Sequence, residues 1–79
     1  IRIYPTVSNG HIIIELSDYI DYDLYIEVYD IIGQLVYKKT ITNVKDKNEI
    51  DISMFAADMY IIKAGFNTKL KQEKLIIYR

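Results

Sequence analysis

The chain has 79 residues, no cysteine and a formal net charge of −1 at pH 7. This length allows one small domain, and the lack of cysteine excludes disulfides, thiol chemistry and cysteine-based zinc sites. Hydrophobic residues make up 51% of the chain, with three Gly and one Pro, which excludes a disordered tail. Acidic and basic residues are interspersed and form no basic patch, so nothing indicates a nucleic-acid partner. No apolar run is long enough to cross a membrane.

Apolar and polar residues alternate with a period of two along most of the chain, which predicts strands with one face turned to a core. Turn signals recur about every 8–12 residues, a spacing typical of sandwiches. We therefore predict an all-β fold: an immunoglobulin-like β-sandwich of about seven antiparallel strands in two sheets. The predicted strands are Ile1–Tyr4, Gly10–Leu16, Leu24–Tyr29, Gln34–Thr42, Glu49–Ile52, Met59–Ala64 and Thr68–Tyr78.

The inward-facing positions of these strands predict the core. Its expected members are Ile3, Ile12, Ile14, Leu16, Leu24, Ile26, Val28, Val36, Ile50, Ile52, Tyr60, Ile62, Leu75 and Ile77. The segment Ser53–Asp58 is long enough for one helical turn at most. The charged segment Lys69–Lys74 continues into an apolar run, which favours a strand over a helix.

The segment Val28–Gly33 predicts a tight hairpin that turns over two residues. The Asp30 carboxylate can accept hydrogen bonds from backbone N–H groups of the turn, and Gly33 can take the positive φ that other residues resist. The same chemistry would serve any hairpin, so these residues alone indicate structure and not function.

Three other patterns are candidate sites. His11, the single histidine, is predicted on an outward face without an orienting partner, so we expect no catalysis. The acidic loop 18–23 has oxygen ligands suited to calcium, but lacks the glycine and distal glutamate of an EF-hand, so a solvated turn is the better interpretation. A sugar-binding platform of Tyr19, Tyr22, Tyr25 and Tyr29 is the second functional hypothesis. We expect no metal and no cofactor.

An ordered set of short motifs spans the chain. Tyr4-Pro5 comes first, then Asn9-Gly10, then Asp30 and Gly33 followed by Val36. Ile50–Ser53, Tyr60 in the penultimate strand and Lys74 in the last strand complete the set. This succession resembles the C-terminal sorting domain of proteins exported by the type IX secretion system. Two positions depart from the family pattern: Thr6-Val7 follows Tyr4-Pro5 where the family continues Asn-Pro, and Asp58 replaces a glycine before Tyr60.

The resemblance implies that residues 1–79 are a single sorting domain, cut from a longer secreted protein with its cargo upstream. It implies a non-catalytic export signal that the type IX outer-membrane translocon recognises, and that a sortase-like peptidase removes during surface attachment of the cargo. The protein would pass through the periplasm to the cell surface or the medium, without inserting in the membrane.

The terminal strand is the predicted recognition element, and its end is expected to be an open sheet edge that a partner strand can join. The recognition residues are Lys74, Leu75, Ile76, Ile77, Tyr78 and Arg79. For Tyr4, Pro5, Asn9, Gly10, Asp30, Gly33 and Tyr60 we expect roles in turns and core. The alternative function is a small accessory module of a secreted enzyme or adhesin that binds carbohydrate or protein.

Overall fold

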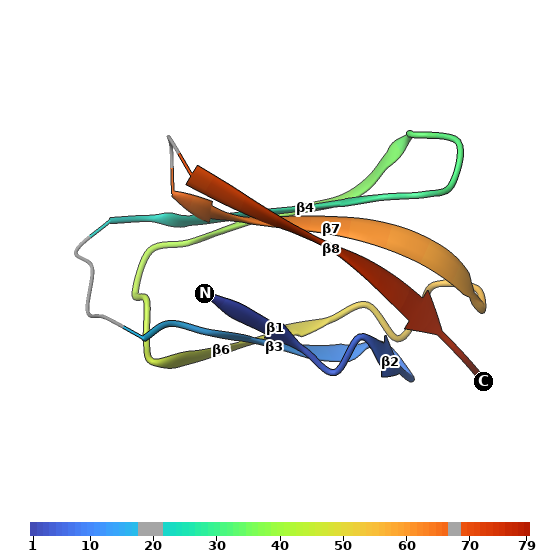
Figure 1. The fold of residues 1–79 in the computed structure, drawn as a ribbon, viewed down its shortest axis with the longest axis horizontal. Coiled ribbons are helices and arrows are strands. Elements are labelled where there is room, and N and C mark those ends of the chain that lie inside the picture. Colours follow the sequence, from blue (N-terminus) through green and yellow to red (C-terminus); the bar gives the residue numbers. More distant parts are fainter. Residues whose placement is uncertain (18–21, 67–68) are drawn as a thin grey trace.

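The computed structural model describes residues 1–17, 22–66 and 69–79, which form two β-sheets packed face to face (Figure 1). The smaller sheet has the order β1 (Arg2–Tyr4), β3 (His11–Glu15), β6 (Lys47–Asp51). The larger sheet has the order β2 (Val7–Ser8), β8 (Lys69–Ile77), β7 (Asp58–Phe66), β4 (Leu24–Tyr29), β5 (Leu35–Ile41). The predicted all-β sandwich is confirmed, and the described residues contain no helix.

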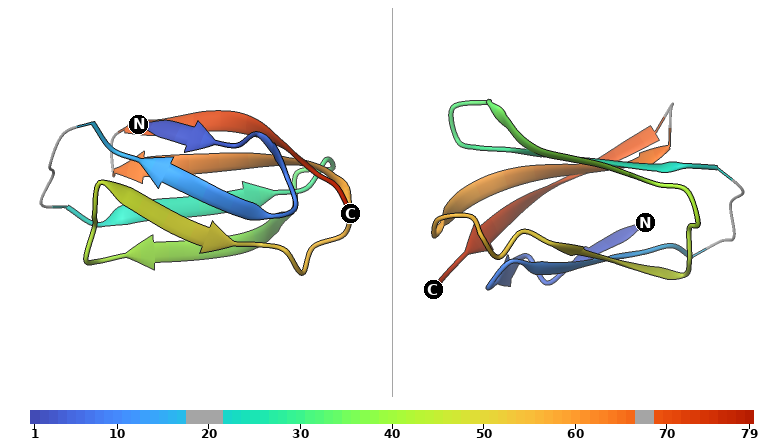
Figure 2. Two further views of the ribbon diagram at one scale, coloured as in Figure 1. Left: turned by 90° about the horizontal axis from the view of Figure 1, so that it is seen from below. Right: turned by 180° about the vertical axis from the view of Figure 1, so that it is seen from behind.

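The first eight residues pass from one sheet to the other (Figure 2). β1 pairs antiparallel with β3, whereas β2 pairs in parallel with the end of β8. The prediction missed β2 and assumed antiparallel pairing throughout, which is wrong for this one pair. A strand of two residues is too short to show alternation, and only its contact with a segment nearly 70 residues away defines it.

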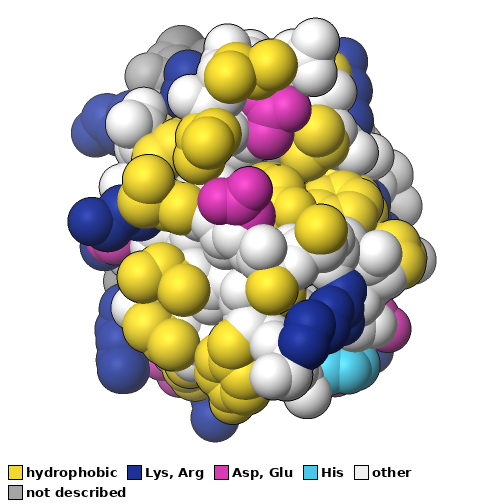
Figure 3. All heavy atoms as spheres, turned by 90° about the vertical axis from the view of Figure 1, so that its right-hand side faces the viewer, with side chains coloured by type: hydrophobic (Ala, Val, Ile, Leu, Met, Phe, Trp, Pro, Cys, Tyr) yellow, Lys and Arg dark blue, Asp and Glu magenta, His cyan; other side chains and the backbone are white. Residues whose placement is uncertain are grey.

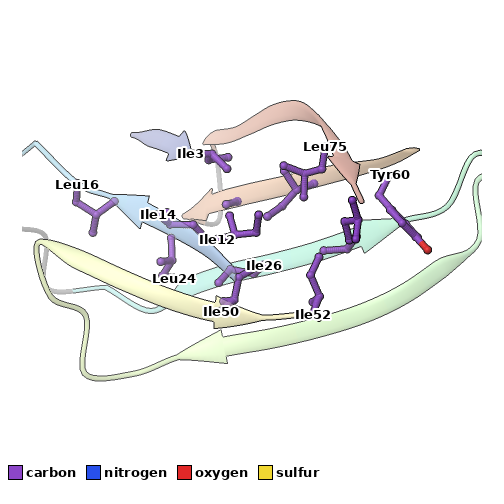
Figure 4. Close-up of a cluster of buried hydrophobic side chains, with 14 residues drawn as sticks. Ile3, Ile12, Ile14, Leu16, Leu24, Ile26, Ile50, Ile52, Tyr60 and Leu75 are labelled. Carbon is purple, nitrogen blue, oxygen red and sulfur yellow. The ribbon is translucent and has the colours of Figure 1, made fainter. Parts of the chain in front are cut away.

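The core lies between the two sheets (Figure 4). Ile12 and Ile14 on β3 face Leu24 and Ile26 on β4, and all four side chains are fully buried. The predicted core is confirmed with one exception, and Ala64 on β7 joins it. Each fully buried Ile or Leu contributes about 1.5–3 kcal/mol relative to an exposed one, so this cluster is the main source of stability.

Val36 is the exception, because its side chain is 38% exposed. The register between β4 and β5 shifts at this point: Val28 lies opposite Tyr37, and Tyr29 lies opposite Leu35, so Val36 has no partner on β4. A β-bulge of this kind changes which side chains face inward. Tyr37 packs against the core in place of Val36.

Two strand boundaries also differ from the prediction. β7 continues through Gly65 and Phe66, which the sequence placed in a turn, and β6 begins at Lys47. Asn48 is buried in β6 because its side chain is fully bonded: Nδ2 donates to the carbonyls of Lys45 (2.7 Å) and Ile14 (3.3 Å), and Oδ1 accepts from the Lys45 N–H (3.0 Å). A turn-forming residue therefore becomes a strand residue that also fixes the preceding loop.

Tyr60 closes one end of the core. It lies near the start of β7, its ring is buried, and its hydroxyl donates a 2.8 Å hydrogen bond to the carbonyl of Ala56, four residues upstream. Phe55 packs between Tyr60 and Tyr37, with ring centroids 5.6 Å and 6.3 Å away. A tyrosine that bonds back to the chain at this corner is a hallmark of immunoglobulin-like sandwiches. Its predicted structural role is confirmed.

Candidate recognition surface

The β4–β5 hairpin has the predicted turn chemistry. Asp30 Oδ1 accepts hydrogen bonds from the N–H groups of Ile32 (3.1 Å) and Gln34 (2.9 Å), and Gly33 has a φ of 88°. The loop contains three residues instead of the predicted two, because Gly33 follows the Ile31-Ile32 turn before Gln34 pairs with Asp30. The turn leaves both isoleucines exposed at its tip.

The motifs of the first ten residues also serve structure. The Tyr4–Pro5 peptide bond is cis. Asn9 Oδ1 accepts a hydrogen bond from the His11 N–H (3.4 Å), and Ser8 Oγ accepts one from the Gly10 N–H (3.0 Å). Gly10 has a φ of 108°, and its carbonyl accepts a hydrogen bond from Ile52 (2.8 Å). This corner starts β3 and ties it to the end of β6.

The six predicted recognition residues do not form one surface. β8 alternates, so Leu75 and Ile77 point into the core and are buried, whereas Lys74, Ile76, Tyr78 and Arg79 are exposed. A partner can therefore contact only the second group without unfolding the strand. Leu75 and Ile77 are buried as the predicted core has them, and recognition of this strand by a partner stays a prediction.

The end of β8 is also not an open edge. The N–H groups of Ile76 and Tyr78 donate to the carbonyls of Thr6 (2.7 Å) and Ser8 (2.9 Å), so β2 occupies the edge at this point. Over its earlier residues, β8 pairs with β7 alone in the described part of the chain. Lys71 Nζ donates to the Ile1 carbonyl (3.1 Å) beside that stretch. The predicted open edge is thus displaced toward the start of the strand.

His11 is half exposed on the outer face of the smaller sheet, as predicted. Its Nδ1 lies 4.0 Å from carboxylate oxygens of Glu49 and Asp51 on β6. Hydrogen bonds from Ser53, including a 2.9 Å bond from its N–H, lower the pKa of Asp51, and His11 adds a smaller effect.

Among the residues that the structure describes, no group of three His, Cys, Asp or Glu side chains could hold a metal ion. Residues 18–21 of the calcium hypothesis lie outside them.

Of the four tyrosines in the predicted sugar-binding platform, Tyr19 lies outside the described residues. Tyr25 and Tyr29 flank Glu27 on the outer face of β4, as predicted. The Tyr29 hydroxyl donates to Glu27 (2.9 Å), which together with desolvation raises the pKa of this phenol. Lys63 Nζ lies 5.0 Å from the centre of the Tyr29 ring. Both the hydroxyl and one face of this ring therefore already have partners.

Strand order and the tyrosine corner define an immunoglobulin-like β-sandwich domain. The family model "Secretion system C-terminal sorting domain" (Por_Secre_tail) matches residues 2–78. The chain therefore belongs to the family of type IX secretion C-terminal sorting domains, and export follows from this membership. No curated protein matches the chain. In the described residues, no helix is long and apolar enough to span a membrane.

Proposed function

We propose that this domain is the export address of a cargo protein, recognised by the type IX outer-membrane translocon through the exposed side chains at the end of β8. The match of the family model to nearly the whole chain carries this proposal. The domain itself performs no catalysis. It crosses the periplasm with its cargo, and a sortase-like peptidase then removes it as the cargo is attached to the cell surface.

The fold supports recognition through side chains at this point. β2 already occupies the backbone edge beside Ile76 and Tyr78, so main-chain pairing with a partner would require β2 to leave. Lys74 lies just before this covered stretch, on the same outward face as Ile76, and is exposed. A charge here is available to a partner and has no packing role.

The test is the charge reversal Lys74→Glu in the chain fused behind a reporter with its own amino-terminal signal peptide. In cells with a type IX system, we expect several-fold less reporter at the surface or in the medium and more in the periplasm. The melting temperature should hardly change, since an exposed charge contributes about 1 kcal/mol or less. Lys47→Glu, an exposed lysine on β6 of the other sheet, is the matched control and should export normally.

Deleting Lys74–Arg79 is a poorer experiment, because it removes the buried Leu75 and Ile77 and the two N–H donors that hold β2. Loss of export would then report unfolding. Normal export of Lys74→Glu, with the wild-type fusion exported, would exclude this lysine from recognition. A wild-type fusion that stays in the periplasm would contradict the export function itself.

A further inference from the structure

The outer face of the five-stranded sheet carries an apolar row at the carboxyl end of β8. Ile76 lies opposite Val7 on β2 and opposite Met59 on β7. All three side chains are exposed, whereas their sequence neighbours Ser8, Ile77 and Tyr60 are buried on the other face. Directly opposed residues of an antiparallel pair, such as Met59 and Ile76, have Cβ atoms about 4.5–5.5 Å apart. Val7 on β2 extends this row to a third strand.

The apolar surface continues toward β5. In the next row, Ile61 on β7 lies opposite Tyr29 on β4, and Tyr29 lies opposite Leu35 on β5. The β4–β5 hairpin rises at this same end of the molecule (Figure 1), and its tip carries Ile31 (60% exposed) and Ile32 (74% exposed). Figure 3 looks at this end and shows hydrophobic side chains gathered across it, with acidic side chains among them. We call the exposed set the apolar pad; it comprises Val7, Ile31, Ile32, Leu35, Val36, Met59, Ile76 and Tyr78.

Basic side chains border the pad. Lys74 stands at the β8 end of the second row, and the third row contains Lys63 on β7 and Lys38 on β5. The one acidic residue of that third row, Glu27, accepts the hydroxyl of Tyr29. On this side of the pad the lysines outnumber the carboxylate, which complements acidic side chains on a partner. Asp58 beside Met59 and Asp30 beside Ile31 add negative charge at the other borders of the pad.

The pad exposes apolar side chains that the core does not use. Its eight exposed side chains expose several hundred Å² of apolar surface, the size at which patches on a monomer become binding sites. None of the eight belongs to the buried cluster that holds the sheets together. Interfaces take this form: an apolar centre with a polar, charged rim.

We propose that the apolar pad docks a protein of the secretion machinery, one that presents an apolar surface bordered by acidic side chains. This inference rests on the proposed function and extends it from the end of β8 to a surface built by four strands and a hairpin. The C-terminal residues Ile76 and Tyr78 form one part of this surface. Val7 and the hairpin tip, far away in the sequence, form the rest.

Two variants test the pad at separate places. Met59→Thr/Ile76→Thr replaces two opposed side chains with threonine, a β-branched residue that strands favour. Ile31→Ser/Ile32→Ser changes only the hairpin tip. Leu70→Thr is the matched control, because Leu70 lies on the same outward face of β8, is 51% exposed against 42% for Ile76, and lies outside the pad. The measurements are reporter export, binding of the purified chain to the detergent-solubilised translocon, and melting temperature.

We expect each pad variant to weaken translocon binding about tenfold and to lower export, with a melting temperature close to that of the Leu70→Thr control. Normal export and binding of both pad variants would overturn the pad and leave the proposed function intact. A wild-type fusion that is not exported would instead contradict the proposed function. Two other outcomes would also overturn the proposal, both with translocon binding of the pad variants unchanged. In the first, the wild type is a dimer in gel filtration and a pad variant is not. In the second, the wild type binds anionic phosphatidylglycerol vesicles and a pad variant does not.

Discussion

Gly10 and Gly33 both have positive φ, but they differ in what surrounds them, and this difference predicts unequal costs for the same substitution. A Cβ atom at Gly10 would lie 2.5 Å from Ser53 Cα and 2.7 Å from Ser53 N, both backbone atoms. A Cβ atom at Gly33 would have nothing within 4 Å. Gly33→Ala therefore carries backbone strain alone, whereas Gly10→Ala carries strain and a steric clash.

Strain at a positive φ costs about 1–2 kcal/mol for a residue with a side chain, so Gly33→Ala should destabilise the fold by that amount. At Gly10 the clash must also push the end of β6 away and weaken the 2.8 Å bond from the Ile52 N–H. Overpacking of this kind adds about 1–3 kcal/mol, which brings Gly10→Ala to about 2–5 kcal/mol. A chain of this length has a free energy of unfolding of about 4–12 kcal/mol, so Gly10→Ala should leave it marginal.

The assay is urea unfolding of the 79-residue chain followed by circular dichroism, with thermal melts alongside. We expect Gly33→Ala to lower the melting temperature by about 4–16 °C, and Gly10→Ala to lower it further, by about 8–40 °C. Gly33→Val should fall between them, at about 1–3 kcal/mol, because a β-branched residue adopts positive φ poorly. Equal midpoints for the two alanine variants would refute the argument that the Gly10 contact with Ser53 decides the cost.

Two further predictions concern the Tyr60 hydrogen bond at the end of the core and the loss of stability at low pH. Tyr60→Phe keeps the buried ring but removes the hydroxyl that donates to the Ala56 carbonyl. It should therefore lower the free energy of unfolding, measured by urea titration, by about 1 kcal/mol. An unchanged urea midpoint would mean that water replaces the hydroxyl. Asp51 has a pKa lowered in the folded chain by hydrogen bonds from Ser53, so the stability it contributes is complete above its unfolded pKa, near 4, and is lost as the pH falls through the lowered value. Asp51→Asn should therefore be less stable than wild type at pH 7 and show a shallower loss below about pH 4; parallel stability–pH curves would contradict this.

Much of the fold follows from local patterns. Alternation placed Ile12, Ile14 and Ile26 in the core because a strand's side chains point to opposite faces whatever its neighbours are. Asp30 and Gly33 marked their turn because the hydrogen bonds and the positive φ involved are confined to five consecutive residues. The succession of motifs likewise predicted the family, since its turns and strand ends occur in a set order along the chain.

Tertiary structure decided the rest, because it depends on which strands become neighbours. β2 exists only through its pairing with β8, and it covers the edge that the sequence predicted to be open. Val36 is exposed because a bulge in β5 shifts its register against β4. Val7, Met59 and Ile76 form one surface because register brings together residues that no window of sequence contains.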